Sequence, residues 1–287
     1  MIAIFKHEIR TAFNSLTVYL FCAALLLFVG VGALLYNIQA SVANFEYVLN
    51  FVSIGLVVFI PLLTMKVFAE ERKQKTDQLL YSLPLKTWEI VLGKYLSLTV
   101  MYLLPLLVIA IYPYIFSKYG DVYLPTSYGS LFSFFMMGAA LIAVGMFISS
   151  ISDNQGFAAG ISIVVFLFNY YSVTLSEQVS STTTGALIAL LVVSLALALV
   201  VKLLTKNDIA ACVTGVVLIV LVVIAFIFFN STFTNLLPNI MKELSLFNRF
   251  KTFINGVFDL SDIVFYLSII IFGNFLTVQS LEKRRYN

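Results

Sequence analysis

Long runs without charged side chains alternate with short charged segments along the whole chain. A helix needs about 20 apolar residues to cross the hydrocarbon core of a bilayer, where it satisfies its own backbone hydrogen bonds. The pattern therefore predicts an all-α polytopic membrane protein, a transmembrane helix bundle with interfacial helices. We expect about eight spans, at Thr17–Ile38, Tyr47–Met65, Tyr95–Phe116, Tyr128–Ser150, Phe157–Leu175, Gly185–Val201, Ile209–Phe229 and Ile263–Ser280.

The composition agrees with this class of protein. Of the 287 residues, 61% are hydrophobic and 11% are charged, and the mean hydropathy is +1.02. Ordinary soluble domains have roughly 45–50% apolar and 25% charged residues. Water could not solvate a chain of this composition, so an ordinary soluble domain is excluded.

The positions of lysine and arginine predict the orientation of the bundle, because cytoplasmic loops carry an excess of both. If the N-terminus is cytoplasmic, 13 of the 17 basic residues lie on the inner side and 4 on the outer side. Eight spans with both termini in the cytoplasm fit this asymmetry. The net charge of +3 then reflects topology, and we expect no nucleic acid partner.

Residues 1–16 form the first informative segment outside the spans. Apolar residues recur there at helical spacing, opposite Lys6, Glu8, Arg10 and Asn14, which predicts a helix lying in the cytoplasmic interface. The stripe consists of Ile2, Phe5, Ile9, Phe13 and Leu16. The only histidine, His7, lies in this helix without visible partners for catalysis or metal binding, so we predict neither a catalytic nor a metal site.

Residues 66–94 form a cytoplasmic loop between the second and third expected spans. After a charged stretch, Thr76 is a good N-cap for a short helix that ends at Pro84. This helix presents one apolar face, made of Leu79, Leu80 and Leu83. Thr87 is expected to cap the next helix, with Glu89 in its first turn. The three leucines either enter a groove on a soluble partner or pack on the chain's own membrane helices.

Residues 239–262 form an amphipathic segment on the expected outer side. A single helical stripe runs through Leu244, Phe247, Phe250, Ile254 and Val257. The segment either closes a path through the bundle or covers its lipid-facing surface. We expect Asp259 and Asp262 to belong to the start of the last helix, with Ser261 as its cap and Asp262 in its first turn.

Two of these segments resemble a known family. The paired glutamates, basic residues, threonine, leucine pair, proline, glutamate and Gly93-Lys94 of the cytoplasmic loop resemble the loop between the second and third spans of ABC type-2 permeases. The close of the chain, from Leu244 to Arg285, resembles the gliding-motility-type subgroup. That family usually has six spans, so 185–229 would be an extra helix pair.

The resemblance implies two sets of functional residues. In that family the first loop is a coupling helix, which sits in a cleft of the ATPase and transmits its closure. The implied docking and coupling residues are Glu70, Glu71, Arg72, Thr76, Leu79, Leu80, Leu83, Pro84, Glu89 and Lys94. By its position, the outer segment resembles a re-entrant hairpin that closes the translocation path, and the implied outer gate consists of Leu244, Phe247, Phe250, Ile254 and Gly256.

The sequence carries no Gly-x-x-x-x-Gly-Lys-Ser/Thr motif, so ATP and magnesium are expected in a partner ATPase rather than in this chain. The resemblance implies a permease subunit of an exporter of an amphipathic or lipid-linked substrate, in a prokaryotic cell membrane. It would pair with a second permease chain, identical or homologous, and with two copies of the ATPase.

Two other classes of function stay open. An ion-coupled secondary transporter normally carries charged residues near the bilayer midplane, whereas the eight expected spans contain none. Such a protein would transport its substrate as a single purified chain, driven by a gradient. A membrane scaffold or regulator would bind its partners but leave their ATPase activity indifferent to substrate.

Overall fold

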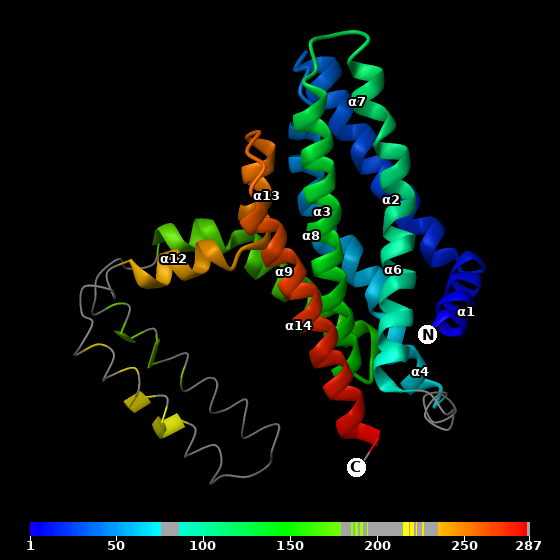
Figure 1. Ribbon diagram of the computed structural model, residues 1–287, viewed down its shortest axis with the longest axis vertical. Coiled ribbons are helices and arrows are strands. Elements are labelled where there is room, and N and C mark those ends of the chain that lie inside the picture. The colour runs from blue at the N-terminus through cyan, green and yellow to red at the C-terminus, as the bar shows by residue number, and fades with distance from the viewer. Residues whose placement is uncertain are drawn as a thin grey trace. The chain divides into compact units, whose positions relative to one another are not determined.

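The computed structural model describes residues 1–75, 86–178 and 235–285, together with isolated residues between 185 and 226. All regular structure within these residues is helical (Figure 1). The chain divides into two compact units. Unit 1 comprises Met1–Tyr170 and Leu246–Asn287, and unit 2 comprises Tyr171–Ser245. Unit 1 contains most of the described helices.

Six helical segments among the described residues are long and apolar enough to cross a membrane. They are α2 (Leu16–Ala33) with the π-helical η1 (Leu34–Gln39), α3 (Glu46–Thr64) with α4 (Lys66–Lys73), α6 (Thr87–Ile109) with α7 (Ile111–Phe116), α8 (Leu124–Ile151), α9 (Gln155–Gln178) and α14 (Leu260–Arg285). These six correspond to six of the eight expected spans. The other two, Gly185–Val201 and Ile209–Phe229, contain only isolated described residues, so the structure does not test them.

Helix α8 is the most buried of the six. In its apolar window 67% of the residues are buried, against 28% for α14 and 33% for α2. It contacts α3, α4, α6 and α14. Small residues allow this close packing, since Gly145 lies against Thr64 of α3 and Gly273 of α14 lies against Ala143. Lipid tails are as apolar as leucine, so such backbone proximity, rather than a hydrophobic driving force, holds membrane helices together.

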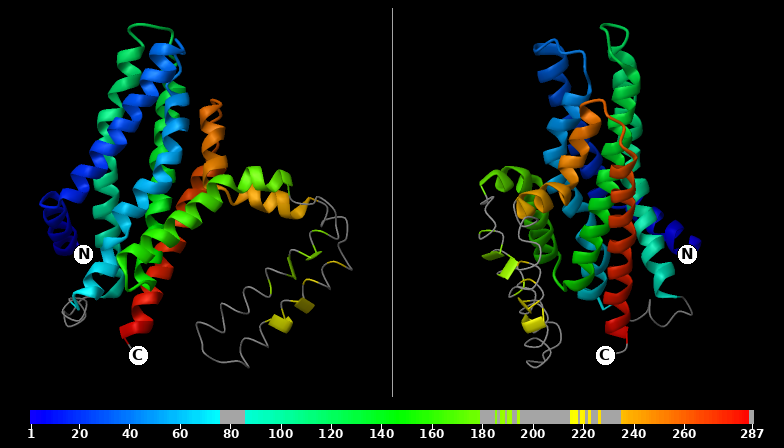
Figure 2. Two further views of the ribbon diagram at one scale, coloured as in Figure 1. Left: turned by 180° about the vertical axis from the view of Figure 1, so that it is seen from behind. Right: turned by 60° about the vertical axis from the view of Figure 1, so that its left-hand side comes forward.

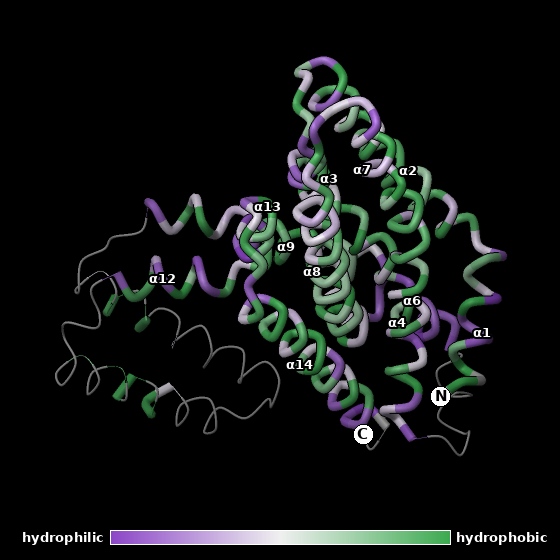
Figure 3. Tube along the Cα trace, turned by 45° about the horizontal axis from the view of Figure 1, so that its top comes forward, coloured by the Kyte–Doolittle hydropathy of each residue, from purple (hydrophilic) through white to green (hydrophobic). Residues whose placement is uncertain are grey.

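Helix α1 (Ile2–Phe13) packs against α6 and α2. Figure 3 shows hydrophilic residues on α1, on α4 and at the C-terminal end of α14, and hydrophobic residues along the middle of the long helices. Phe5 and Ile9 of the expected apolar stripe are half-buried, whereas Ile2 and Phe13 are exposed. The face assigned to Glu8 was wrong: its carboxylate points to the bundle, where it meets a lysine of α6.

The single helix expected over 239–257 is two helices, α12 (Leu236–Glu243) and α13 (Leu246–Ile254). They are separated at Leu244–Ser245, and α12 belongs to unit 2 whereas α13 belongs to unit 1. The stripe continues only within α13, where Phe247 and Phe250 are buried. The apolar periodicity gave no sign of the break, because the spacing of the stripe is helical on both sides of it.

Two expected helix caps also differ from the structure. Helix α6 follows Lys86, and Thr87 is its first helical residue rather than its cap. Glu89 does lie in the first turn, where its carboxylate accepts the Lys86 N–H at 3.2 Å. At the start of α14, Asp259 rather than Ser261 accepts the helical N–H, at 2.8 Å from Ser261 N. A carboxylate competes well for this position because it also favours the positive end of the helix dipole.

The contact between α6 and α8 provides a test of the packing. Tyr102 lies over Gly138, and its hydroxyl donates to the Phe134 carbonyl at 2.9 Å. In Gly138→Ala the new Cβ would lie 2.3 Å from the tyrosine ring, and overpacking of this kind costs about 1–3 kcal/mol. We expect the melting temperature of the purified protein to fall by several degrees. Gly30→Ala is the control because its Cβ meets no atom within 4 Å, and equal melting temperatures for the two variants would contradict this packing.

Candidate functional site

Lys94 is the centre of a buried ion-pair cluster at one end of unit 1. Its side chain is 2% exposed, and its Nζ lies 2.7 Å from Glu8 Oε1 and 2.5 Å from Glu71 Oε1. The ammonium group also lies 3.4 Å from the Val67 carbonyl and 5.4 Å from the centre of the Phe68 ring. One lysine therefore joins three helices, α1, α4 and α6. We call Glu8, Glu71 and Lys94 the Lys94 cluster.

Local sequence explains how the Lys94 cluster forms. Gly93 lies where α1 crosses α6, and a Cβ there would be 3.1 Å from Ile4 and 3.3 Å from the Met1 carbonyl. Glu8 follows Ile4 by four residues, so both lie on the face of α1 that meets α6. Gly93 thus allows α1 to pack closely on α6, and Lys94 binds the Glu8 carboxylate of α1. Glu71 belongs to α4, which precedes the segment 76–85 in the sequence, whereas Lys94 follows that segment.

A second cluster closes the C-terminal end of α8. Arg72 donates to the Ser152 carbonyl at 3.1 Å and also to the Ser150 carbonyl. Arg284 donates to the Ile151 carbonyl and to Asp153 Oδ1, both at 2.7 Å. The last carbonyls of a helix lack intrahelical partners and carry partial negative charge, so guanidinium groups stabilise this end. We call Arg72, Asp153 and Arg284 the Asp153 cluster.

Asp153 lies between the two arginines, 3.5 Å from Arg72 and 2.7 Å from Arg284. The hydrogen bond from Arg284 lowers the pKa of this carboxyl below its ordinary value of 3.8; partial burial opposes that effect, and the charges of both arginines add to it. The carboxylate is therefore charged at neutral pH. Its side chain is 76% exposed, so the charge is accessible to solvent although it is paired.

Both flanks of the segment 76–85 are thus bound to the bundle. On the N-terminal flank, Ser149 of α8 accepts the N–H groups of Phe68 and Ala69 at 3.3 and 3.4 Å and donates to the Met65 carbonyl at 3.1 Å. Arg72 adds the contact to the end of α8, and Glu71 adds the contact to α6. On the C-terminal flank, Lys94 is bound to α1 and α4.

The structure places the described members of the predicted docking set as follows. Glu71 and Lys94 bind one another, and Arg72 belongs to the Asp153 cluster. Glu70 is half-buried and accepts from Gln74 Nε2 at 3.4 Å. Glu89 begins α6 and lies 3.9 Å from the amino group of Met1. The remaining members, Thr76, Leu79, Leu80, Leu83 and Pro84, lie outside the described residues.

The predicted outer-gate residues are divided by the break before α13. Phe247 packs on Tyr170 at 5.0 Å between ring centres, and Phe250 packs on Phe134 of α8 at 5.6 Å. Ile254 is half-buried at the end of α13, and Gly256 follows with a φ of 80°, a conformation that favours glycine. Leu244 lies before the break and is 56% exposed. Three of the five residues therefore belong to α13 itself.

Polar side chains hold α13 at both of its ends. The Leu246 N–H donates to Asn169 Oδ1 at 3.0 Å, and Tyr266 Oη donates to the Leu246 carbonyl at 2.9 Å. Near the other end, Ser130 of α8 donates to the Phe253 carbonyl at 3.1 Å.

A charged contact joins α13 to α14 as well. Arg249 lies 2.6 Å from Asp262, and its guanidinium group covers the Phe265 ring at 4.1 Å. Thr252 donates to the second oxygen of the same carboxylate at 2.6 Å. Asp262 is therefore part of a buried contact in addition to its place in the first turn of α14.

Glu46 is a buried acid that the sequence did not single out. It begins α3, is 3% exposed, and accepts a hydrogen bond from Ser127 of α8 at 2.8 Å. The expected span began one residue later, which left Glu46 in an outer loop. Phe45 just before it and Val48 two residues after it are fully buried, so an acid among apolar residues at a helix start was the available signal.

The geometry defines a multi-pass helical membrane protein that carries paired charges at one end of its bundle. Comparison with protein families adds that the model for the ABC-2 family transporter protein matches residues 31–183. The chain belongs to this ABC-2 transporter family, which confirms the resemblance to ABC type-2 permeases. Searches of curated proteins and of solved structures gave no match.

Removing the lysine tests the Lys94 cluster. Lys94→Met leaves Glu8 and Glu71 facing one another without a cation, and breaking a buried pair in this way costs about 3–5 kcal/mol. We expect a clear fall in the melting temperature of the purified protein. Lys73→Met on the exposed side of α4 is the control and should change stability by less than about 0.5 kcal/mol.

Replacing all three charged residues of the cluster distinguishes the destabilisation caused by unpaired carboxylates from that caused by the loss of the lysine's packing contacts. Lys94→Met combined with Glu8→Gln and Glu71→Gln removes every charge of the cluster and should recover part of the lost stability. A Lys94→Met protein as stable as the Lys73→Met control would show that the cluster does not hold α1 and α4.

Proposed function

We propose that the chain is the membrane-spanning permease subunit of an ATP-binding cassette exporter, driven by a separate ATPase subunit. The observation that carries this proposal is that both flanks of the segment 76–85 are held by polar contacts to other helices: Glu71 pairs with Lys94 of α6, Arg72 donates to the end of α8, and Lys94 also pairs with Glu8 of α1. A loop that receives force from a partner needs such flanks. Membership of the ABC-2 transporter family supports the same conclusion.

The two clusters supply a route for that force. Displacement of the N-terminal flank would act on α6 and α1 through Glu71 and Lys94. It would act on α8 and α14 through Arg72, because the Asp153 cluster contains residues of both the α8–α9 turn and α14. Closure of the ATPase against the loop would therefore be distributed over four helices rather than absorbed by one.

The remaining parts of the proposal follow from the family and the sequence. Two copies of the ATPase would bind ATP and magnesium, since this chain carries no P-loop motif. A second permease chain, identical or homologous, would complete the path. The substrate would be amphipathic or lipid-linked, and the membrane would be a prokaryotic cell membrane. Within the family, the chain would belong to the gliding-motility-type subgroup.

In this proposal α13 serves as the outer gate. Support comes from Phe250, which packs on Phe134 of α8, and from the polar contacts of α13 to the neighbouring helices. The Arg249–Asp262 pair joins it to the start of α14. Movement of α14, whose other end carries Arg284, would thereby reach α13.

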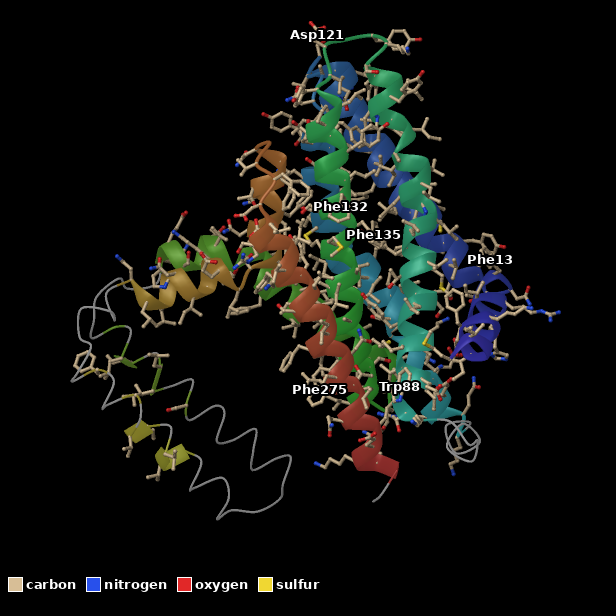
Figure 4. The ribbon with its side chains drawn as sticks, in the orientation of Figure 1. Phe13, Trp88, Asp121, Phe132, Phe135 and Phe275 are labelled. Atoms are coloured by element: carbon tan, nitrogen blue, oxygen red, sulfur yellow. The ribbon has the colours of Figure 1, made fainter. Side chains whose placement is uncertain are left out.

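We further propose that the end of unit 1 containing α4 faces the cytoplasm, because basic residues are concentrated there. Figure 4 shows Asp121 and Trp88 at opposite ends of the long helices. Single cysteines at Gln74 and Asp121, in a background without Cys22 and Cys212, should react with an impermeant thiol reagent from the cytoplasmic and outer sides respectively. Labelling of both from one side would contradict this topology.

Substitution within the loop tests docking of the ATPase. If Leu79, Leu80 and Leu83 enter an apolar groove, Leu80→Asp places an unpaired carboxylate there at a cost of roughly 3 kcal/mol. Such a cost corresponds to about a hundredfold weaker docking. The measurement is co-purification of the ATPase with the permease, normalised to the permease in the membrane.

The matched control is Gln74→Ala, at an exposed position on the same loop, which should retain the ATPase. The amount of folded permease should be equal in both variants, since neither position lies in an expected span. Normal ATPase recovery with Leu80→Asp would refute docking through this face and would favour leucines that pack on the chain's own helices.

A further inference from the structure

A cavity of about 410 Å³ lies between α2 and the α3–α4 junction. Its volume falls within the range of about 300–1,000 Å³ that is typical of small-molecule sites. Polar side chains occur only at its end nearest α1, and the rest of its wall is apolar. The lining residues are Ser15, Leu16, Thr17, Leu20, Phe21, Ala24, Phe59, Leu62, Met65 and Lys66.

The cavity forms because α2 and α3 pack closely only in their other halves. There Phe28 stacks on Phe51 at 5.4 Å, and Gly32 and Gly55 bring the two backbones together. Figures 1 and 2 show the helices side by side toward η1 and farther apart toward α1 and α4. Below the contact of Phe28 with Phe59, small Ala24 leaves the space unfilled.

The polar end of the cavity is positively charged. Lys66 is half-buried, donates to Thr17 Oγ1 at 3.0 Å, and makes no ion pair among the described residues. Ser15 caps α2 and accepts the Thr17 N–H at 3.3 Å, so the positive end of that helix dipole adds to the lysine. These groups together offer hydrogen-bond donors and positive potential to an anion.

An adjoining cavity of about 370 Å³ shares Ser15, Thr17 and Lys66 with the first cavity and is also lined by three acidic residues. Two of them, Glu8 and Glu71, bind Lys94 at 2.7 and 2.5 Å. The third, Glu70, accepts a hydrogen bond from Gln74. None of the three lines the cavity between α2 and α3, and among the described residues none forms an ion pair with Lys66, whose ammonium group donates to Thr17.

The apolar wall of this cavity opens to the surroundings of the bundle. Leu16 is 80% exposed, Leu20 is 62% exposed and Leu62 is 36% exposed. In a bilayer these side chains contact acyl chains, and the Lys66 end lies where the apolar parts of α2 and α3 stop, at the depth of lipid headgroups. An occupant must therefore be an amphiphile with its charged group at Lys66 and its chain along the helices.

We propose that this cavity binds an anionic phospholipid of the adjacent leaflet. Its phosphate would lie against Lys66 and the hydroxyls of Ser15 and Thr17, and one acyl chain would lie along Leu20, Ala24 and Phe59. This binding needs neither the ATPase nor transport, so it goes beyond the proposed function and is tested separately from it.

The experiment measures lipid binding by the purified full-length chain in nanodiscs, with native mass spectrometry of retained lipid. Phosphatidylglycerol should be retained in preference to phosphatidylcholine. Lys66→Gln should weaken phosphatidylglycerol retention about fivefold, the contribution of one basic residue near a membrane surface, and should leave phosphatidylcholine unchanged. The matched control is Lys73→Gln, an exposed lysine of the same helix, which should have no effect.

A steric pair tests the chain-binding part of the cavity. Ala24→Phe fills the cavity while preserving Lys66, and should abolish selective retention. Ala23→Phe places the same ring at the neighbouring, exposed position outside the lining and should retain the lipid. Leu62→Trp provides a second blocking variant from α3, and thermal unfolding confirms that each variant is folded.

Three outcomes would overturn the proposal. The first is equal retention of the two lipids by the wild-type chain. The second is a loss of phosphatidylglycerol retention in Lys66→Gln that Lys73→Gln reproduces, or that the folded Ala24→Phe and Leu62→Trp variants do not show. Either result would mean that the lipid is attracted by surface charge in general rather than bound in the cavity. The third is displacement of phosphatidylglycerol by water-soluble glycerophosphate, which would mean a phosphate site without a lipid chain.

Discussion

A buried positive charge needs a partner, and in this protein that constraint organises one end of the bundle. Lys94 lies two turns inside α6 among apolar neighbours, where an unpaired ammonium group would cost several kcal/mol. Carboxylates from two other helices meet that need. Because Glu8 and Glu71 come from two different helices, pairing the charge also fixes where α1 and α4 lie.

The need for a partner also applies to the backbone carbonyl groups at the end of α8, which carry partial negative charge. The orphan carbonyls of that helix are satisfied by guanidinium groups from α4 and α14, which are more than 200 residues apart in sequence. The turn between α8 and α9 is therefore a meeting point for distant segments. In an apolar solvent, where association of helices gains little from burial alone, such polar contacts specify which helices meet.

Sequence reasoning located the six described spans because hydrophobic length is a strong signal in membrane proteins. It also recognised the family, through the loop of Glu70, Glu71, Gly93 and Lys94. It did not find that Glu71 and Lys94 bind each other, nor that Glu8 completes the pair, since a helical stripe cannot tell lipid from a neighbouring helix. The break between α12 and α13 was missed for a similar reason: periodicity reports the face of a helix, whereas the division of the chain into units depends on tertiary contacts.

The tyrosine at the α6–α8 crossing has a consequence for motion. Tyr102 covers Gly138 with its ring and binds the Phe134 carbonyl with its hydroxyl, so the two helices are interlocked both sterically and by hydrogen bonding. Sliding one past the other would require loss of both contacts at once. A displacement of one of these helices would therefore carry the other with it, so α6 and α8 behave as one rigid pair.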